Sequence, residues 1–175
     1  METKKIIGIL KVSNVDTFNI NIEILKKNNI NDIILYSKNL NHLELYNIGK
    51  ELKNKNPILK IGYNFKNLSA LNTFNYLIEN KINLDYIWIE NTYVGTNKLK
   101  AKEIKAKWLE YKELFPEIIY IGGLLYSNQI KPLNTNYSIH LASKYMEVVS
   151  TTNDDNINLV KIFSFKNILK EKPFC

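Results

Sequence analysis

The sequence has few of the residues that mark special chemistry or a special compartment. Its single cysteine, Cys175, excludes an internal disulfide framework, and such cysteine-poor chains are typical of the reducing cytoplasm. No uninterrupted apolar run approaches the roughly 18 residues that a membrane helix needs. The first ten residues also lack the long apolar segment and the cleavage site of a signal peptide. We therefore expect a soluble cytoplasmic protein that does not bind membranes.

Histidine and turn glycine are scarce as well. His42 and His140 stand alone, without a second histidine or cysteine at ligand spacing, so no metal site is expected. The turn after the first apolar segment, Val12–Asp16, contains no glycine. The phosphate loop that usually opens a dinucleotide-binding fold is therefore missing. The sequence does not identify a cofactor.

What the sequence has in quantity is lysine, and its net charge is +7. A basic protein of this kind could bind nucleic acid. However, the lysines are spread over the whole chain, and the densest group lies between 98 and 107, where Glu103 and Glu110 accompany it. This mixture is typical of a solvated helix face. Nucleic acid is therefore not the expected partner.

Two kinds of apolar segment alternate along the chain. Short β-branched or aromatic runs indicate strands, and longer segments with helical spacing indicate helices. The predicted strands are Lys5–Val12, Asp32–Tyr36, Ile58–Tyr63, Tyr86–Ile89, Ile118–Ile121 and Met146–Ser150. The predicted helices are Phe18–Lys27 with Asp16 or Thr17 as its cap, Asn41–Lys53, a segment capped by Ser69, Lys98–Leu114, Asn136–Lys144 and Ile157–Lys170. The inward faces are predicted to carry Ile20, Ile24 and Leu25 in the first helix. The second is predicted to carry Leu43 and Tyr46, with Leu52 as a further candidate, and the fourth Ile104 and Trp108, with Leu99 and Tyr111 as further candidates.

Strands that alternate with helices predict βαβ units and a parallel sheet, because parallel neighbours need a crossover helix. A doubly wound open sheet and a (β/α) barrel both satisfy this pattern. The units are even in length, and the first turn lacks glycine. We therefore predict an α/β protein whose residues 1–175 form one (β/α) TIM-barrel-like domain with about six βα units.

Five short motifs occur along the chain in the order and spacing seen in the BtpA-like TIM-barrel family, which the sequence resembles. They are Leu45-Tyr46, Ile61–Phe65, Ile87–Asn91, Ile121–Gly123 and Tyr145–Thr151. More narrowly, the chain resembles an uncharacterised bacterial branch that is often labelled phosphoribosyltransferase. The resemblance covers nearly the whole chain. It implies a barrel that binds or converts a small metabolite, phosphorylated or ribosyl in character.

The chain departs from that family in two respects. Family members have a Gly-rich loop after the sixth strand, whereas this chain has Thr152–Asn156, where two carboxylates would repel a phosphate. The family also continues through strands 7 and 8, where barrels commonly hold a phosphate, and both are missing here. We expect either that the natural gene continues beyond Cys175, or that the polypeptide forms homo-oligomers through its open strand edges or is poorly soluble.

Polar and small residues follow the predicted strands, at the ends that share one mouth in a barrel. Glu90, after the buried run Tyr86–Ile89, is the predicted general acid or base, and Lys11 is expected beside it. The predicted ligand-binding residues are Ser37, Asn39, Asn64, Asn91, Gly122, Gly123, Ser150, Thr151 and Asn153. The amides would orient a carbonyl or hydroxyl, and the glycine backbone would admit a ligand closely. The alternative is structural: Glu90 pairs with a lysine and the asparagines close loops.

Three functions stay open at this point. The first is a small-molecule barrel enzyme, phosphoribosyltransferase-like as the resemblance implies or of another kind, with Glu90 central. The second is a non-catalytic binding or regulatory protein that kept the fold and lost the phosphate-binding loops. The third is a weak nucleic-acid binder. A small-molecule ligand at the strand ends is the prediction shared by the first two.

Overall fold

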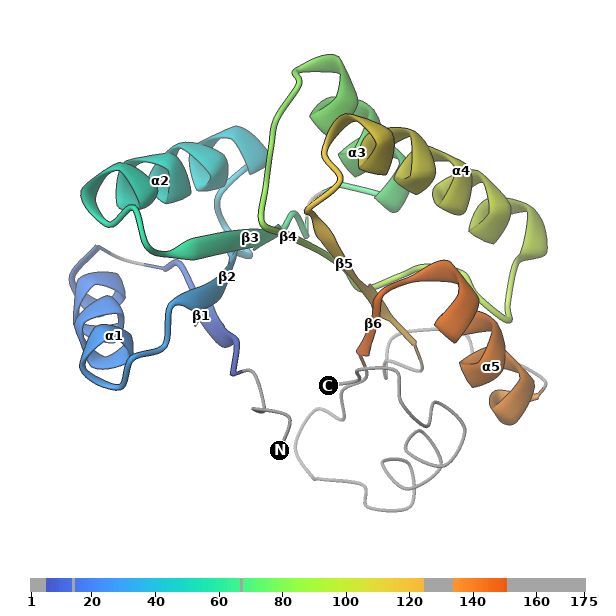
Figure 1. Cartoon of the computed structure of the whole chain (residues 1–175), viewed down its shortest axis with the longest axis horizontal. Coiled ribbons are helices and arrows are strands. Elements are labelled where there is room, and N and C mark those ends of the chain that lie inside the picture. Colours follow the sequence, from blue (N-terminus) through green and yellow to red (C-terminus); the bar gives the residue numbers. More distant parts are fainter. Residues whose placement is uncertain (1–5, 14, 67, 125–133, 151–175) are drawn as a thin grey trace. The chain divides into compact units, whose positions relative to one another are not determined.

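The computed structural model describes residues 6–13, 15–66, 68–124 and 134–150, in which strands and helices alternate strictly (Figure 1). The strands are β1 (Gly8–Lys11), β2 (Asp32–Tyr36), β3 (Lys60–Asn64), β4 (Tyr86–Ile89), β5 (Ile119–Gly123) and β6 (Val148–Ser150). The helices are α1 (Val15–Lys27), α2 (His42–Lys55), α3 (Ala70–Glu79), α4 (Lys98–Leu114) and α5 (Thr135–Tyr145). The predicted helix Ile157–Lys170 lies outside the described residues.

The strand order decides between the two predicted architectures. The strands hydrogen-bond in the order β1-β2-β3-β4-β5-β6, and the pairs β1–β2, β2–β3, β3–β4 and β5–β6 are parallel. A doubly wound sheet reverses its order at a switch point, whereas a barrel adds each strand beside the previous one. The described residues therefore form an α/β fold of the barrel type, incomplete at six strands, and the predicted fold class is confirmed.

By compactness the chain divides into two units. The first comprises Met1–Leu68 and Leu84–Ile87, and the second comprises Ser69–Asn83 and Trp88–Cys175, so the boundary runs through β4. That residues 1–175 act as a single domain stays a prediction.

In the first unit, α1 and α2 cover one face of β1–β3 (Figure 1). The helix α2 begins where the sequence supplies an N-cap, because the Asn41 side chain accepts the backbone N–H groups of Leu43 and Glu44, while Glu44 accepts the N–H of Asn41. The strand β3 begins two residues later than predicted. Pro57 and Ile58 form a turn before it, and Ile58 is exposed.

The predicted inward face of α1 is wrong for Ile20 and Ile24, but its third residue, Leu25, is half-buried and lies against β1, where a Cβ atom at Gly8 would be 3.1 Å from it. Ile20 and Ile24 are 61% and 51% exposed, whereas Phe18 and Ile22 are buried. Isoleucines alternate with polar residues in this helix and so lie all round it, and their spacing alone does not select a face. The helix also begins at Val15, so the proposed caps Asp16 and Thr17 lie inside it.

The phase of α2 differs from the prediction at Leu43, which is exposed, while Leu45 and Gly49 are buried and Leu52 is buried as predicted. The cause is a close contact at Gly49. A Cβ atom there would lie only 2.0 Å from the Tyr63 hydroxyl oxygen on β3. Glycine at this position lets the helix approach the sheet, and this contact fixes which side of α2 faces inward.

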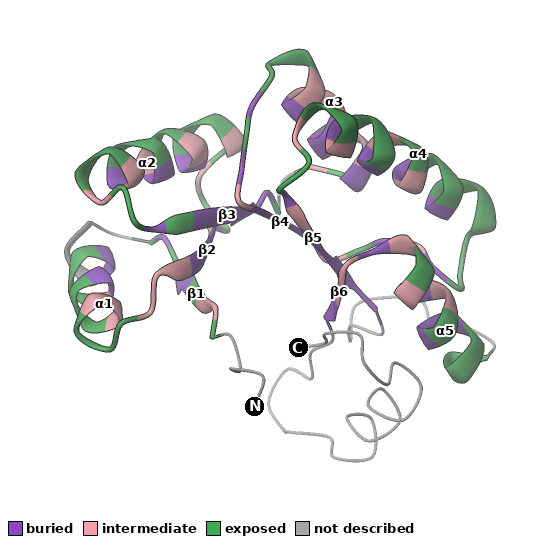
Figure 2. Ribbon diagram, in the orientation of Figure 1, coloured by how far each residue is buried: buried purple, intermediate pink, exposed green. Residues whose placement is uncertain are grey.

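In the second unit, α3, α4 and α5 lie on one face of β5 and β6 (Figure 2), and α3 packs against α4. Ser69 caps α3 as predicted, since its hydroxyl accepts the backbone N–H of Asn72. The core beneath these helices is an aromatic cluster of Phe74, Trp108, Tyr111 and Tyr120, with neighbouring ring centroids 5.1–6.3 Å apart.

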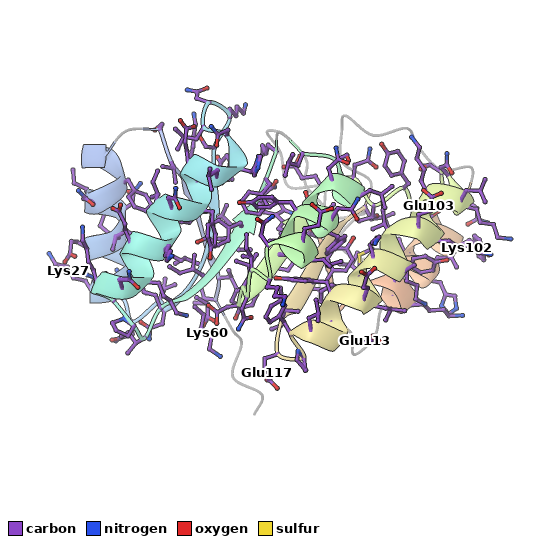
Figure 3. The ribbon with its side chains drawn as sticks, turned by 90° about the horizontal axis from the view of Figure 1, so that it is seen from above. Lys27, Lys60, Lys102, Glu103, Glu113 and Glu117 are labelled. Carbon is purple, nitrogen blue, oxygen red and sulfur yellow. The ribbon has the colours of Figure 1, made fainter. Side chains whose placement is uncertain are left out.

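The outer face of α4 carries charges of both signs, as predicted. Lys102, Glu103 and Glu113 are labelled on it in Figure 3, and Lys107 pairs with Glu110 at 2.8 Å. Within the described ranges, no helix combines the length and the apolar character that crossing a membrane requires. The strands β1 and β6 are the edge strands of the described sheet. Association of copies through these edges stays a prediction.

Candidate functional site

The two faces of the sheet in the first unit can be assigned from the strand register. Leu10, Leu35 and Tyr63 are Cα partners on β1, β2 and β3. Tyr63 faces α2, because its hydroxyl donates to the carbonyl oxygen of Tyr46 at 3.4 Å and lies where a side chain at Gly49 would be. The side chains of this row therefore point toward the helices. The next residue on each strand points to the opposite face.

That next row consists of Lys11, Tyr36 and Asn64, which are Cα partners at the carboxyl ends of β1, β2 and β3. Neighbouring strands lie about 4.8 Å apart, so the three side chains leave the sheet close together. Lys11 is exposed, Tyr36 is half-buried and Asn64 is buried. A second lysine joins them, since the Lys66 ammonium lies 5.1 Å from the centroid of the Tyr36 ring. We call these four residues the strand-end row.

The strand-end row brings together two of the predicted site residues, Lys11 and Asn64, and adds two that the sequence analysis missed. Alternation along β2 shows only that Tyr36 points away from the side of Leu35. Its place beside Lys11 and Asn64 depends on the register between the strands, which no sequence pattern in the chain reveals. Lys66 follows β3 by two residues, and no feature of the sequence distinguished it from the other lysines as a site residue.

Ser37 and Asn39 were also predicted to bind a ligand after β2. Ser37 is buried, and its hydroxyl donates to the carbonyl oxygen of Val12 at 2.8 Å. The hydroxyl oxygen of Ser37 also accepts the backbone N–H groups of Asn39 and Leu40, at 3.3 and 3.2 Å. These bonds join the loops after β1 and β2, so a structural role accounts for Ser37. The side chain of Asn39 is exposed, and its ligand-binding role stays a prediction.

In the second unit, Glu90 and Asn91 follow β4 directly. Glu90 is half-buried and Asn91 is exposed. The side-chain oxygen of Asn91 accepts the backbone N–H of Tyr93 at 3.2 Å, and Tyr93 has a left-handed backbone with φ of 55°. Asn91 therefore closes the turn after the strand, which is the structural alternative stated for it. Glu90 stays the predicted acid or base of this unit.

The end of β5 is closely packed. A Cβ atom at Gly122 would lie 2.3 Å from the Met146 sulfur and 3.1 Å from a methyl carbon of Thr92. Met146 therefore occupies the space that was predicted for a ligand. The carbonyl oxygen of Gly123 accepts the hydroxyl of buried Thr92 at 2.9 Å. These contacts assign packing roles to Gly122 and Thr92, and the second of these residues was missed from the sequence.

Ser150 ends β6 and is buried. Its hydroxyl accepts the indole N–H of Trp88 on β4 at 3.1 Å, across the intervening strand β5. Barrel interiors pack in this way, with side chains from alternate strands in one layer. Trp88 is thus a core residue, as predicted. Thr151 and Asn153 lie outside the described residues.

Lys11 belongs to the first unit and Glu90 to the second, so their predicted pairing stays a prediction. Histidines take no part in either group. His42 is the first residue of α2 and packs its ring edge-on to Phe65, and His140 is exposed on α5. Among the residues that the structure describes, no three His, Cys, Asp or Glu side chains are grouped to hold a metal ion.

The chain matches no protein-family model and no curated protein.

Proposed function

We propose that the protein binds a small polar metabolite at the carboxyl ends of β1–β3, as a barrel-type protein of the BtpA-like kind. The observation that supports this proposal is the strand-end row, in which Lys11, Tyr36 and Asn64 share one register position on the face away from the helices. Ligands of parallel α/β proteins bind at the carboxyl ends of the strands. That part of the argument rests on analogy between folds.

The chemistry of the row suits binding. A phenol hydroxyl donates and accepts hydrogen bonds, a side-chain amide does both, and a lysine ammonium donates only. Such a set can orient hydroxyl and carbonyl groups of a ligand. It contains no carboxylate, so an acid–base step would need a residue such as Glu90 in addition.

A second candidate is a binding or regulatory protein without catalysis. The engagement of Ser37, Asn91 and Ser150 in structural hydrogen bonds favours it, because few of the predicted strand-end side chains are left for chemistry. Turnover of a ligand that binds would support the enzyme, and binding without turnover would support this alternative.

The binding proposal is tested by screening sugars, sugar phosphates and small carboxylic acids with ligand-observed NMR, followed by titration of Tyr36→Phe. This change removes one hydroxyl and keeps the ring beneath Lys66. Loss of one hydrogen bond should weaken binding by about threefold to tenfold. Tyr93→Phe is the matched control, since Tyr93 is half-buried after β4 and has Lys100 4.8 Å from its ring centroid. Equal affinities for both variants, or no ligand in the screen, would contradict the proposal.

A further inference from the structure

The charges of α4 are separated by sign around the helix. Lys98, Lys102 and Lys105 follow one another at the spacing i, i+4 and i+7, which places them along one side of α4. Glu103 and Glu110 lie two turns apart along a different side of the helix. In the linear sequence the two signs are mixed, and this mixture led to the expectation of a solvated face. On the folded helix, Lys98, Lys102 and Lys105 form one stripe of positive charge, which we call the lysine stripe.

The ion pairs of α4 do not include the lysine stripe. Glu110 pairs with Lys107 at 2.8 Å, and Glu147 pairs with Lys112 at 3.5 Å. Among the residues that the structure describes, no lysine of the stripe forms an ion pair. The first turn of α4 also contains no acidic residue, although the helix dipole favours one there. Positive charge therefore collects in the first half of α4, where it is available to a negatively charged partner.

A row of side chains on α5 lies beside the lysine stripe. Tyr137, Leu141 and Tyr145 follow one another at the spacing i, i+4 and i+8, and the Lys105 ammonium lies 4.8 Å from the centroid of the Tyr145 ring. The helices α4 and α5 run in the same direction (Figure 1), because each returns the chain to the start of the next parallel strand. Tyr137 is 59% exposed, and α5 contains no aspartate or glutamate. We call the lysine stripe together with Tyr137 and Tyr145 the α4–α5 surface.

We infer that the α4–α5 surface binds a single-stranded nucleic acid. Lysines neutralise the phosphates of such a strand, and its unpaired bases stack on aromatic rings, so a surface that combines both suits it. An anionic membrane suits the surface less well. A helix that lies on a membrane inserts an apolar face, whereas Leu109 is the one exposed apolar residue that continues the lysine stripe at the same spacing.

This inference goes beyond the proposed function and does not depend on it. The α4–α5 surface belongs to the second unit of the chain, whereas the strand-end row belongs to the first. The variants that test the surface leave every residue of the strand-end row unchanged. A failure of the inference therefore leaves the proposed metabolite binding as it stands.

The experiment measures binding of labelled oligothymidylate and oligouridylate, each of about 20 nucleotides, to the full chain by fluorescence anisotropy. We expect a Kd of about 10 µM or below in about 50 mM salt, and weaker binding in about 200 mM salt. Replacing all three lysines of the stripe with glutamine should weaken binding at least about tenfold in the lower salt. It should also reduce the slope of log K against log salt by about 2, because three phosphate contacts are lost.

The matched control replaces Lys27, Lys50 and Lys55 with glutamine. These lysines are exposed on α1 and α2 of the first unit, and Lys27 is labelled in Figure 3. The control variant loses the same net charge, and its affinity should stay within about twofold of the unchanged protein. An equal loss in the two triple variants would reduce binding to general charge and overturn the inference.

The stacking contact is tested separately at Tyr137. Tyr137→Ala should weaken binding of both oligonucleotides by about tenfold, and Tyr137→Phe should leave it unchanged, because the ring is kept. Unaltered affinity of Tyr137→Ala would overturn the assignment to a single strand. So would binding to vesicles of phosphatidylserine and phosphatidylcholine without binding to either oligonucleotide. If the triple stripe variant does not fold, as judged by circular dichroism, Lys98→Gln and Lys102→Gln take its place, and each should reduce the salt slope by about 0.7.

Discussion

The hydroxyl of Tyr120 lies in the aromatic cluster of the second unit without a hydrogen-bond partner among the residues that the structure describes. The side chain is buried against Phe74 and Trp108, with ring centroids 5.6 and 5.1 Å away. Burial, and secondly the charge of Glu147, raises the pKa of Tyr120, so this hydroxyl stays protonated. A donor that gave up its water and gained no partner lowers the stability of the fold.

Tyr120→Phe removes this donor and keeps the ring contacts. Burying a hydroxyl without a partner costs about 1–3 kcal/mol. The void left by one oxygen atom costs roughly 0.3 kcal/mol in return. We therefore expect the free energy of unfolding to rise by about 1–2 kcal/mol, which for a chain of this size raises the melting temperature by about 3–6 °C.

Tyr111→Phe is the matched control within the same cluster. The Tyr111 hydroxyl is buried too, but it donates to the carbonyl oxygen of Ile82 at 2.7 Å. Removing it leaves that carbonyl without this bond and should lower stability by about 1–2 kcal/mol. Thermal and urea unfolding of both variants should give changes of opposite sign. If Tyr120→Phe destabilises the protein as much as Tyr111→Phe, then the Tyr120 hydroxyl has a partner such as a buried water, and the reasoning is refuted.

Two further predictions concern a helix contact and the candidate acid. Gly49→Ala forces a methyl group against the Tyr63 hydroxyl and should lower the free energy of unfolding by about 1–3 kcal/mol. The control is Lys50→Ala at an exposed position of the same helix, which should change the free energy of unfolding by less than about 0.5 kcal/mol. Similar urea midpoints for the two variants would contradict this prediction. Glu90→Gln should abolish turnover or weaken ligand binding and leave the melting temperature unchanged. A loss of about 1–3 kcal/mol with unaltered binding would instead remove Glu90 from the site.

The first and last residues of some elements could be predicted, because polar residues or proline mark their ends. The bounds of β2, β4 and α4 coincide with the predicted ones. Short apolar runs between polar residues mark the two strands, and Pro116 lies just beyond the end of α4. The strand order then followed from the regular alternation of units. Local pattern was sufficient here, because each element contains its own start and stop signals.

The buried face of each helix and the residues that are adjacent on neighbouring strands were harder to predict, because both depend on contacts between elements. The phase of α2 is fixed by Gly49 meeting Tyr63 on another element, and a helical wheel does not contain that information. The same holds for the candidate site. Lys11 and Asn64 could be named as strand-end residues, but the place of Tyr36 between them depends on the register. Ser37, one residue further, points to the other side and closes loops instead.

Two of the strands that contain glycine, β3 and β5, show why small residues inside a strand need an explanation from neighbouring strands. On β3, a Cβ atom at Gly62 would lie 2.3 Å from that of Tyr86, whose hydroxyl reaches beyond β3 to Asp32 on β2. On β5, Gly123 is the Cα partner of Ser150, which Trp88 reaches from β4. In each unit an aromatic side chain of β4 bonds to a polar group two strands away. A strand that presents glycine leaves room for such a crossing, because it places no side chain in the path. Gly122, which looked suited to a ligand in the sequence, therefore serves the packing of the sheet.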